Sequence, residues 1–179
     1  MKKYFALALL SLAIIGCAKA PTTTTNTTSN ATASGSNESD PPSIRSVDVV
    51  KVQPQETALA PGASGEAVVL VQIANGYHVN ANPPSQPYLK ATELELQPAE
   101  GISVDFITYP DPLIRKFSFS ETPLKVYEGD TNLKVRLKAD KNAAPGKHNL
   151  SAKLRVQACD DKVCYAPGAL DLIVPVNVK

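Results

Sequence analysis

The sequence has little of several features that would define a common class of protein. Its 179 residues contain no tryptophan, only two histidines and three cysteines, and the net charge is +1. A nearly balanced charge gives no argument for a nucleic-acid partner. The few histidines and cysteines make no zinc-ligand pattern, and without a Gly-x-Ser-x-Gly element a hydrolase has little support. We therefore expect no metal, no cofactor and no nucleic acid.

The first residues of the chain have the pattern of an export signal. Lysines at positions 2 and 3 precede an apolar run over residues 4–15. This run is shorter than the roughly 20 residues that span a bilayer, and a basic start before a short apolar run is typical of a signal peptide. The segment Ile14-Ile15-Gly16-Cys17 resembles the lipobox of bacterial lipoproteins, in which the cysteine is lipidated. We predict a signal peptide over residues 1–16 and lipidation of Cys17. The alternative is an ordinary signal with an incidental cysteine.

The residues after Cys17 predict a membrane anchor and a tether. Ala18 stands where lipoproteins retained in the inner membrane usually have Asp, so we expect an outer-membrane lipoprotein that faces the periplasm. Several acyl chains, such as palmitate, anchor a protein stably where a single chain binds only marginally. Residues 17–42 are rich in Thr, Ser and Asn, and such a composition buries too little apolar surface to fold. Residues 43–179 remain as one domain with its own core.

The domain is expected to be all-β. Fifteen prolines in the chain disfavour long helices, and no amphipathic helix or internal repeat is visible. Short runs of alternating or β-branched residues recur instead, which is typical of an immunoglobulin-like β-sandwich, with a barrel as the alternative. The last run contains Pro175, so we place it at a sheet edge. The predicted strands are 47–52, 66–74, 77–80, 92–97, 102–109, 124–127, 133–138, 150–156 and 170–178.

Two cysteines of the domain, Cys159 and Cys164, lie close together in the sequence. In an exported protein they should form a disulfide. A ring of six residues stabilises a fold by only about 2 kcal/mol, against about 4 kcal/mol for a sixty-residue loop, so this bridge is a poor staple. Short, exposed disulfides are also the exchangeable ones. The spacing alone leaves a redox function and a structural clasp equally open.

The residues around this pair resemble a known family. Gln157-Ala158-Cys159-Asp160-Asp161 followed by Cys164-Tyr165-Ala166-Pro167 is similar to the active-site segment of the N-terminal periplasmic domain of the thiol:disulfide interchange protein DsbD, although the spacing is shorter by one residue than in its best-known member. The resemblance implies an immunoglobulin-like domain whose cysteine pair passes electrons. It extends upstream through residues 76–84, 87–89, 109–110 and 126–129.

The resemblance also implies roles for individual residues. Cys164 would form the mixed disulfide with a partner and Cys159 would resolve it. An aromatic cap would cover the bridge, and the matching stretch offers Phe117 or Phe119, either of which could instead belong to the core. The strand that lies near the cysteines in the family carries His78 and Asn80 here, and Tyr165 directly follows Cys164.

The expected partners follow from what DsbD contains and this sequence lacks. DsbD continues into a multi-helix membrane domain and a thioredoxin-like domain, whereas this sequence ends at Lys179 and has no Cys-x-x-Cys motif. We therefore expect a separate reductant, either a thioredoxin-like protein or a membrane thiol reductase. The electrons would go to a periplasmic disulfide isomerase or a cytochrome c maturation protein. The predicted activity is a thiol:disulfide oxidoreductase relay; the alternative is a non-catalytic immunoglobulin-like binding module.

Overall fold

The computed structural model describes residues 43–179, so the predicted signal peptide, Cys17 and the tether lie outside the described residues. No helix in residues 43–179 is long and apolar enough to cross a membrane. This part of the chain contains one short 3-10 helix and twelve strands. They are η1 (Ser46–Val49), β1 (Val50–Pro54), β2 (Thr57–Leu59), β3 (Ser64–Ile73), β4 (His78–Asn80), β5 (Glu93–Leu96), β6 (Ile102–Thr108), β7 (Leu113–Arg115), β8 (Leu124–Tyr127), β9 (Asp130–Ala139), β10 (Gly146–Val156), β11 (Ala158–Cys159) and β12 (Gly168–Val178).

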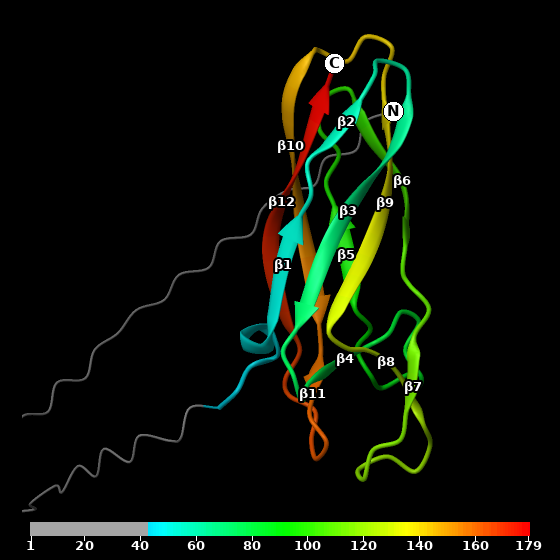
Figure 1. The fold of residues 1–179 in the computed structure, drawn as a ribbon, viewed down its shortest axis with the longest axis vertical. Helices are drawn as coiled ribbons and strands as arrows, with labels where there is room; N and C mark the ends of the chain where they lie inside the picture. The colour runs from blue at the N-terminus through cyan, green and yellow to red at the C-terminus, as the bar shows by residue number, and fades with distance from the viewer. Residues whose placement is uncertain (1–42) are drawn as a thin grey trace, which may run out of the picture. The chain divides into compact units, whose positions relative to one another are not determined.

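Two four-stranded sheets form the body of the sandwich. Their strand orders are β1-β3-β9-β6 and β2-β12-β10-β5, and both are open sheets with free edges (Figure 1). Strict alternation along β9 buries every second residue, because successive side chains of a strand point to opposite faces. The apolar faces of both sheets meet in one buried cluster. The predicted all-β sandwich is therefore confirmed. The cluster includes Val69, Val71, Leu133, Val135, Leu137, Leu150, Leu154, Leu172, Val174 and Val176.

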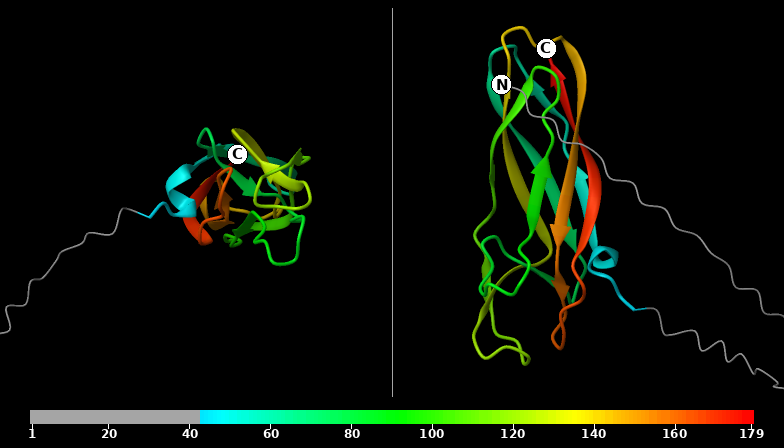
Figure 2. Two further views of the ribbon diagram at one scale, coloured as in Figure 1. Left: turned by 90° about the horizontal axis from the view of Figure 1, so that it is seen from below. Right: turned by 180° about the vertical axis from the view of Figure 1, so that it is seen from behind.

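A third sheet, with the order β11-β4-β8-β7, lies at one end of this body (lower end of Figure 1). Its strands are two to four residues long. A small apolar cluster of Leu89, Phe117, Leu124 and Val126 packs beneath it. Two loops extend from this end in both side views, one between β7 and β8 and one between β11 and β12 (Figure 2). Cys159 ends β11, and Cys164 lies in the second of these loops.

Two expectations about strands were wrong. The predicted strand over residues 47–52 begins as the 3-10 helix η1, in which Asp48 accepts a hydrogen bond from the backbone N–H of Arg45 at 2.9 Å. The strand β12 is not an edge strand, because it lies between β2 and β10. Pro175 is tolerated there because β2 pairs with β12 only from Val176 onward, so Pro175 has β10 as its single neighbouring strand.

Candidate functional site

Cys159 and Cys164 are joined by a disulfide that closes a tight hairpin. The S–S distance is 2.02 Å and the two Cα atoms are 3.9 Å apart. Backbone hydrogen bonds flank the pair on both sides, from Asp160 N–H to the Val163 carbonyl at 2.9 Å and from Tyr165 N–H to the Ala158 carbonyl at 2.8 Å. The cysteines are thus a non-hydrogen-bonded antiparallel pair, the position at which side chains of opposite strands approach most closely.

The two sulfur-bearing residues differ in exposure. Cys159 is 0% exposed, whereas Cys164 is half-buried. Cys164 also lines a groove of about 330 Å³ whose walls are mostly apolar. Cys164 is therefore the cysteine that is open to solvent and to the groove, whereas Cys159 is enclosed. The other residues that line the groove are Tyr88, Leu89, Phe119, Ser120, Leu124, Gln157, Lys162 and Val163.

Asp160 shapes the ring between the two cysteines. Its carboxylate accepts hydrogen bonds from the backbone N–H groups of Lys162 and Val163 at 2.7 and 2.8 Å and from the Tyr165 hydroxyl at 2.7 Å. The Tyr165 hydroxyl, followed by the two backbone donors, lowers the pKa of Asp160. The same carboxylate raises the pKa of Tyr165 to about 12. The Asp160 carboxylate therefore holds the turn in place through the two backbone groups, and the Tyr165 hydroxyl binds the same carboxylate.

A network of side-chain amides holds the residues that lead into the cysteine ring. The Gln157 side-chain oxygen accepts from the Lys90 backbone N–H at 2.9 Å and from the Asn80 side-chain amide at 3.1 Å. The Gln157 side-chain nitrogen donates to the Tyr165 carbonyl at 3.3 Å. Asn80 is buried and contacts Gln157 in this network, while its own Oδ1 is buried without a partner. Gln157 was part of the motif but was not singled out from the sequence.

Ser46 is a site residue that the sequence did not indicate. Its hydroxyl accepts from the Ala158 backbone N–H at 3.0 Å and donates to the Ala166 carbonyl at 2.6 Å. It thereby ties together the residues that precede and follow the cysteine ring. Next to it, a Cβ on Gly168 would lie 2.6 Å from the Val47 side chain, so η1 packs closely on the start of β12. Ser46 is 112 residues from Ala158, and no local pattern marks such a contact.

Both candidate cap phenylalanines belong to one aromatic stack. The rings of His78 and Phe117 are stacked with centroids 4.0 Å apart, and Phe117 and Phe119 are stacked at 5.4 Å. Phe117 is 8% exposed and belongs to the small apolar cluster, whereas Phe119 is 37% exposed and lines the groove beside Cys164. The Ser118 hydroxyl donates to the Asp161 carbonyl at 2.9 Å, which attaches this loop to the cysteine ring.

His78 lies at the inner end of the stack and directly opposite Cys159 in the β4–β11 ladder. It is 2% exposed, and its Nε2 is buried without a hydrogen-bond partner. Burial lowers the pKa of His78, while Glu128, Asp161 and Asp160 act in the opposite direction. The imidazole is thus favoured in its neutral form inside the site.

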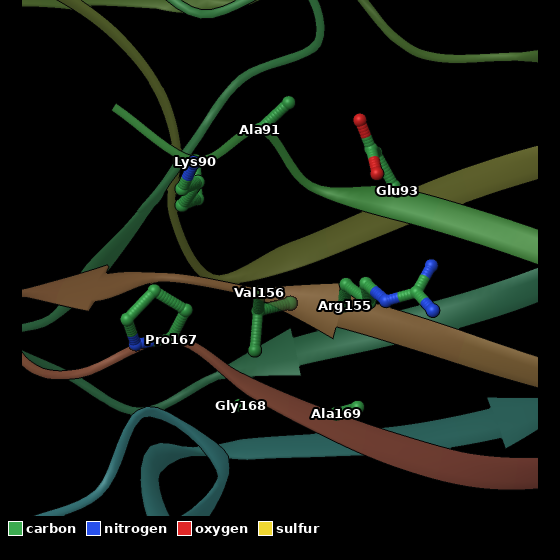
Figure 3. A pocket seen from close by; sticks show the side chains of 8 residues that line it. All are labelled: Lys90, Ala91, Glu93, Arg155, Val156, Pro167, Gly168 and Ala169. Atoms are coloured by element: carbon green, nitrogen blue, oxygen red, sulfur yellow. The ribbon is translucent and has the colours of Figure 1, made fainter. Parts of the chain in front are cut away.

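A second cavity, of about 380 Å³, lies away from the disulfide between the beginnings of β5 and β12 (Figure 3). Val156 lines it, and the ladder partners Glu93 and Arg155 stand at one side. It is lined by no cysteine or histidine. Within residues 43–179, no group of three or more His, Cys, Asp or Glu side chains could hold a metal ion. The chemistry of the described residues is therefore concentrated at the disulfide.

Fold and site together define a β-sandwich domain with a locally closed disulfide, in which one cysteine is buried and the other is partly exposed. The sequence model of the family described as "Thiol:disulfide interchange protein DsbD, N-terminal" matches residues 47–172. The chain belongs to this family, and this membership supports a thiol:disulfide exchange domain. No curated protein matches the sequence.

Solved structures are similar to the chain at low sequence identity. The N-terminal periplasmic domain of ScsB from Proteus mirabilis is 17% identical with a TM-score of 0.50, and the match covers 73% of this chain and 47% of that one. The reduced N-terminal domain of Neisseria meningitidis DsbD is 18% identical with a TM-score of 0.41, over 65% of this chain and 82% of that one. The chain thus spans about half of the ScsB domain. At this low identity, the similarity to the ScsB domain supports the fold alone.

Proposed function

We propose that this protein is a lipid-anchored thiol:disulfide exchange domain that relays electrons from a thioredoxin-like reductant to oxidised envelope proteins through Cys159 and Cys164. The observation that carries the proposal is the difference between the two sulfurs. Cys159 is fully buried while Cys164 is half-buried beside an apolar groove. Exchange needs one sulfur that a partner thiolate can attack and a second that leaves and later resolves the adduct.

The proposed reduction proceeds in two displacements. A thiolate of the partner attacks Sγ of Cys164, the S–S bond breaks, and Cys159 leaves as a thiolate that takes up a proton. The second thiol of the partner then loses its proton and attacks the mixed disulfide, which releases Cys164. The partner is oxidised by two electrons and the domain is reduced by two. The reverse sequence, starting from the Cys164 thiolate, passes both electrons to an oxidised substrate.

The proposed location follows from family and sequence. The ScsB domain of similar fold is periplasmic, and an oxidising envelope compartment is one in which disulfides form and persist. Lipidation of Cys17 would anchor the domain to the outer membrane, facing the periplasm. We propose a thioredoxin-like protein or a membrane thiol reductase as the electron donor. A periplasmic disulfide isomerase or a cytochrome c maturation protein is the proposed acceptor.

Trapping of the mixed disulfide tests the proposal. The Cys159→Ala variant, mixed with an oxidised thioredoxin-like protein, should form a covalent adduct that is visible on a non-reducing gel. The matched Cys164→Ala variant should form much less, because its remaining thiol is buried. Both variants should carry Cys17→Ser, so that a single thiol remains in each. Equal trapping by both variants would contradict the assigned roles.

The structural clasp is the alternative that the same experiment decides. If neither variant traps a partner, and the wild-type disulfide resists reduced thioredoxin-like proteins while the domain stays folded, the bridge does not exchange. A measured potential below about −300 mV would agree with that outcome, because structural disulfides fall in this range. A potential near those of the periplasmic exchange proteins would support the relay.

A further inference from the structure

The burial of Cys159 creates a requirement for a proton carrier. A thiol attacks a disulfide only as the thiolate, so Cys159 must lose a proton each time it resolves a mixed disulfide on Cys164. In the opposite direction it leaves as a thiolate and must gain one. Because Cys159 is 0% exposed, bulk water does not contact it. A side chain inside the site is therefore better placed than bulk water to accept and return this proton.

His78 is the titratable side chain placed for that task. It pairs with Cys159 in the antiparallel ladder of β4 and β11, and Cys159 pairs with Cys164 in turn. Directly opposite residues of antiparallel strands present their side chains on the same face. The side chains of His78, Cys159 and Cys164 therefore lie on one face, at successive positions of the ladder. The only other histidine, His148, lies near the start of β10 with its Nε2 2.7 Å from the Ala144 carbonyl.

The Nε2 atom of His78 has no hydrogen-bond partner in the disulfide form. It is buried without a hydrogen-bond partner, a condition that folded proteins mostly avoid. In the disulfide neither sulfur carries a proton, so neither can donate to this nitrogen. Reduction turns Cys159 into an S–H donor on the same face of the sheet. We propose that His78 is the general base and acid for Cys159 during exchange, an inference that rests on the proposed function of the disulfide.

The surroundings of His78 suit this role. Phe117 stacks on the imidazole, Phe119 stacks on Phe117, and His78 is 2% exposed. Burial lowers the pKa of His78 and so favours the neutral base at neutral pH. The charged groups that face it are Glu128, which is held by Arg115 at 3.0 Å, and Asp161 and Asp160 of the cysteine ring. These carboxylates would stabilise the imidazolium once it has taken the proton.

The proposed step transfers one proton and exchanges one disulfide for another. With Cys164 bound to a partner as a mixed disulfide, the proton of the Cys159 thiol moves to Nε2 of neutral His78. The Cys159 thiolate attacks Sγ of Cys164, the Cys159–Cys164 bond forms, and the partner leaves as a thiolate. The imidazolium then gives its proton to the departing thiolate or to solvent. During reduction of the domain the proton lost by the second thiol of the partner passes to His78, directly or through solvent, and the imidazolium gives it to the Cys159 thiolate.

The test uses 5,5′-dithiobis(2-nitrobenzoate), a small disulfide that needs no docking. The reduced full chain with Cys17→Ser should release two equivalents of thionitrobenzoate. The first is released when Cys164 attacks the reagent and forms a mixed disulfide with it. The second is released when Cys159 attacks that mixed disulfide. His78→Phe keeps an aromatic ring for the stack on Phe117 but cannot carry a proton. General acid–base catalysis contributes ~10²–10⁴-fold, so we expect the second release to slow at least ten-fold at pH 6–7. The first release should be unchanged.

Controls separate the possible results. His148→Phe should leave both steps unchanged and keep the pH dependence of the second. His78→Gln, which is polar but does not titrate in this range, should be as slow as His78→Phe, and it replaces that variant should the latter not fold. An unchanged second step in a folded His78 variant overturns the proposal. If the wild-type chain itself fails to release the second equivalent, the proposed function of the disulfide fails instead, and the inference fails with it.

Discussion

The body of the sandwich and the end that carries the disulfide are built on different principles. In the body, long strands such as β9 and β12 alternate strictly and bury almost only apolar side chains. At the disulfide end the strands are two to four residues long, and buried polar residues gather there. Five polar residues are buried within residues 43–179. Ser46, His78, Asn80 and Thr92 lie around the cysteine segment or the strands beside it, and Thr131 lies on β9.

The difference indicates where stability and function reside. Apolar burial needs no specific partner, so the body can be stable without a particular arrangement of polar groups. Buried polar groups must find hydrogen bonds, and each one therefore fixes its surroundings in a particular geometry. Asn80, Gln157 and Ser46 fix the cysteine segment in this way. The body should therefore tolerate loss of the site, whereas the site depends on the body.

The largest effect is expected in the body. Leu137 is fully buried between the two sheets, and Leu137→Ala should lower the free energy of unfolding by about 2–5 kcal/mol because it removes packed methyl groups and leaves a cavity. Urea denaturation followed by circular dichroism measures this loss. In the folded, reduced variant, the rate at which Cys164 is alkylated should match that of the wild type. A changed alkylation rate would mean that body and site are not separable.

A smaller effect is expected from removing the disulfide. The double variant Cys159→Ala/Cys164→Ala should lose about 2 kcal/mol in the free energy of unfolding, because the bridge closes a ring of only six residues. Urea denaturation of this variant beside the oxidised wild type gives the difference. A loss of about 4 kcal/mol or more, the size expected for a bridge between distant strands, would favour the clasp over the relay.

The smallest effect concerns Tyr165 at high pH. Its pKa is raised to about 12 by Asp160, so the folded chain favours the neutral hydroxyl. The resulting stability is fully present below the unfolded pKa of about 10 and is lost as the pH rises toward 12. The free energy of unfolding of Tyr165→Phe should therefore fall slightly less than that of the wild type between about pH 9 and about pH 11.5, a range that brackets the unfolded pKa. Tyr127, whose pKa is raised by burial, is present in both proteins and cancels from the comparison. Identical pH profiles would show that the hydrogen bond contributes nothing measurable.

Periodicity predicted the body well. The run over residues 124–127 coincides with β8, and the alternation over 133–138 lies inside the longer β9. The strands β2, β7 and β11 were missed, since two or three residues are too few to show a period. The strand that contains Pro175 was wrongly placed at an edge, because a sequence does not reveal that β2 pairs with the last residues of this strand.

The site was predictable where its residues are neighbours in sequence. The short spacing indicated a disulfide between Cys159 and Cys164, and the structure contains it. The choice between Phe117 and Phe119 has no single answer, because the two rings stack on one another. Ser46 could not be found, since its two hydrogen bonds join segments more than a hundred residues apart.

The position of Ser46 bears on how this domain can be shortened. The family match begins at residue 47, one residue beyond Ser46, and ends at residue 172, before the buried side chains of Val174, Val176 and Val178. A fragment cut to those limits would leave the Ala158 N–H and the Ala166 carbonyl without the hydroxyl that joins them. It would also remove the half of β12 that pairs with β2. We therefore expect that a fragment able to fold on its own extends beyond the family match at both ends.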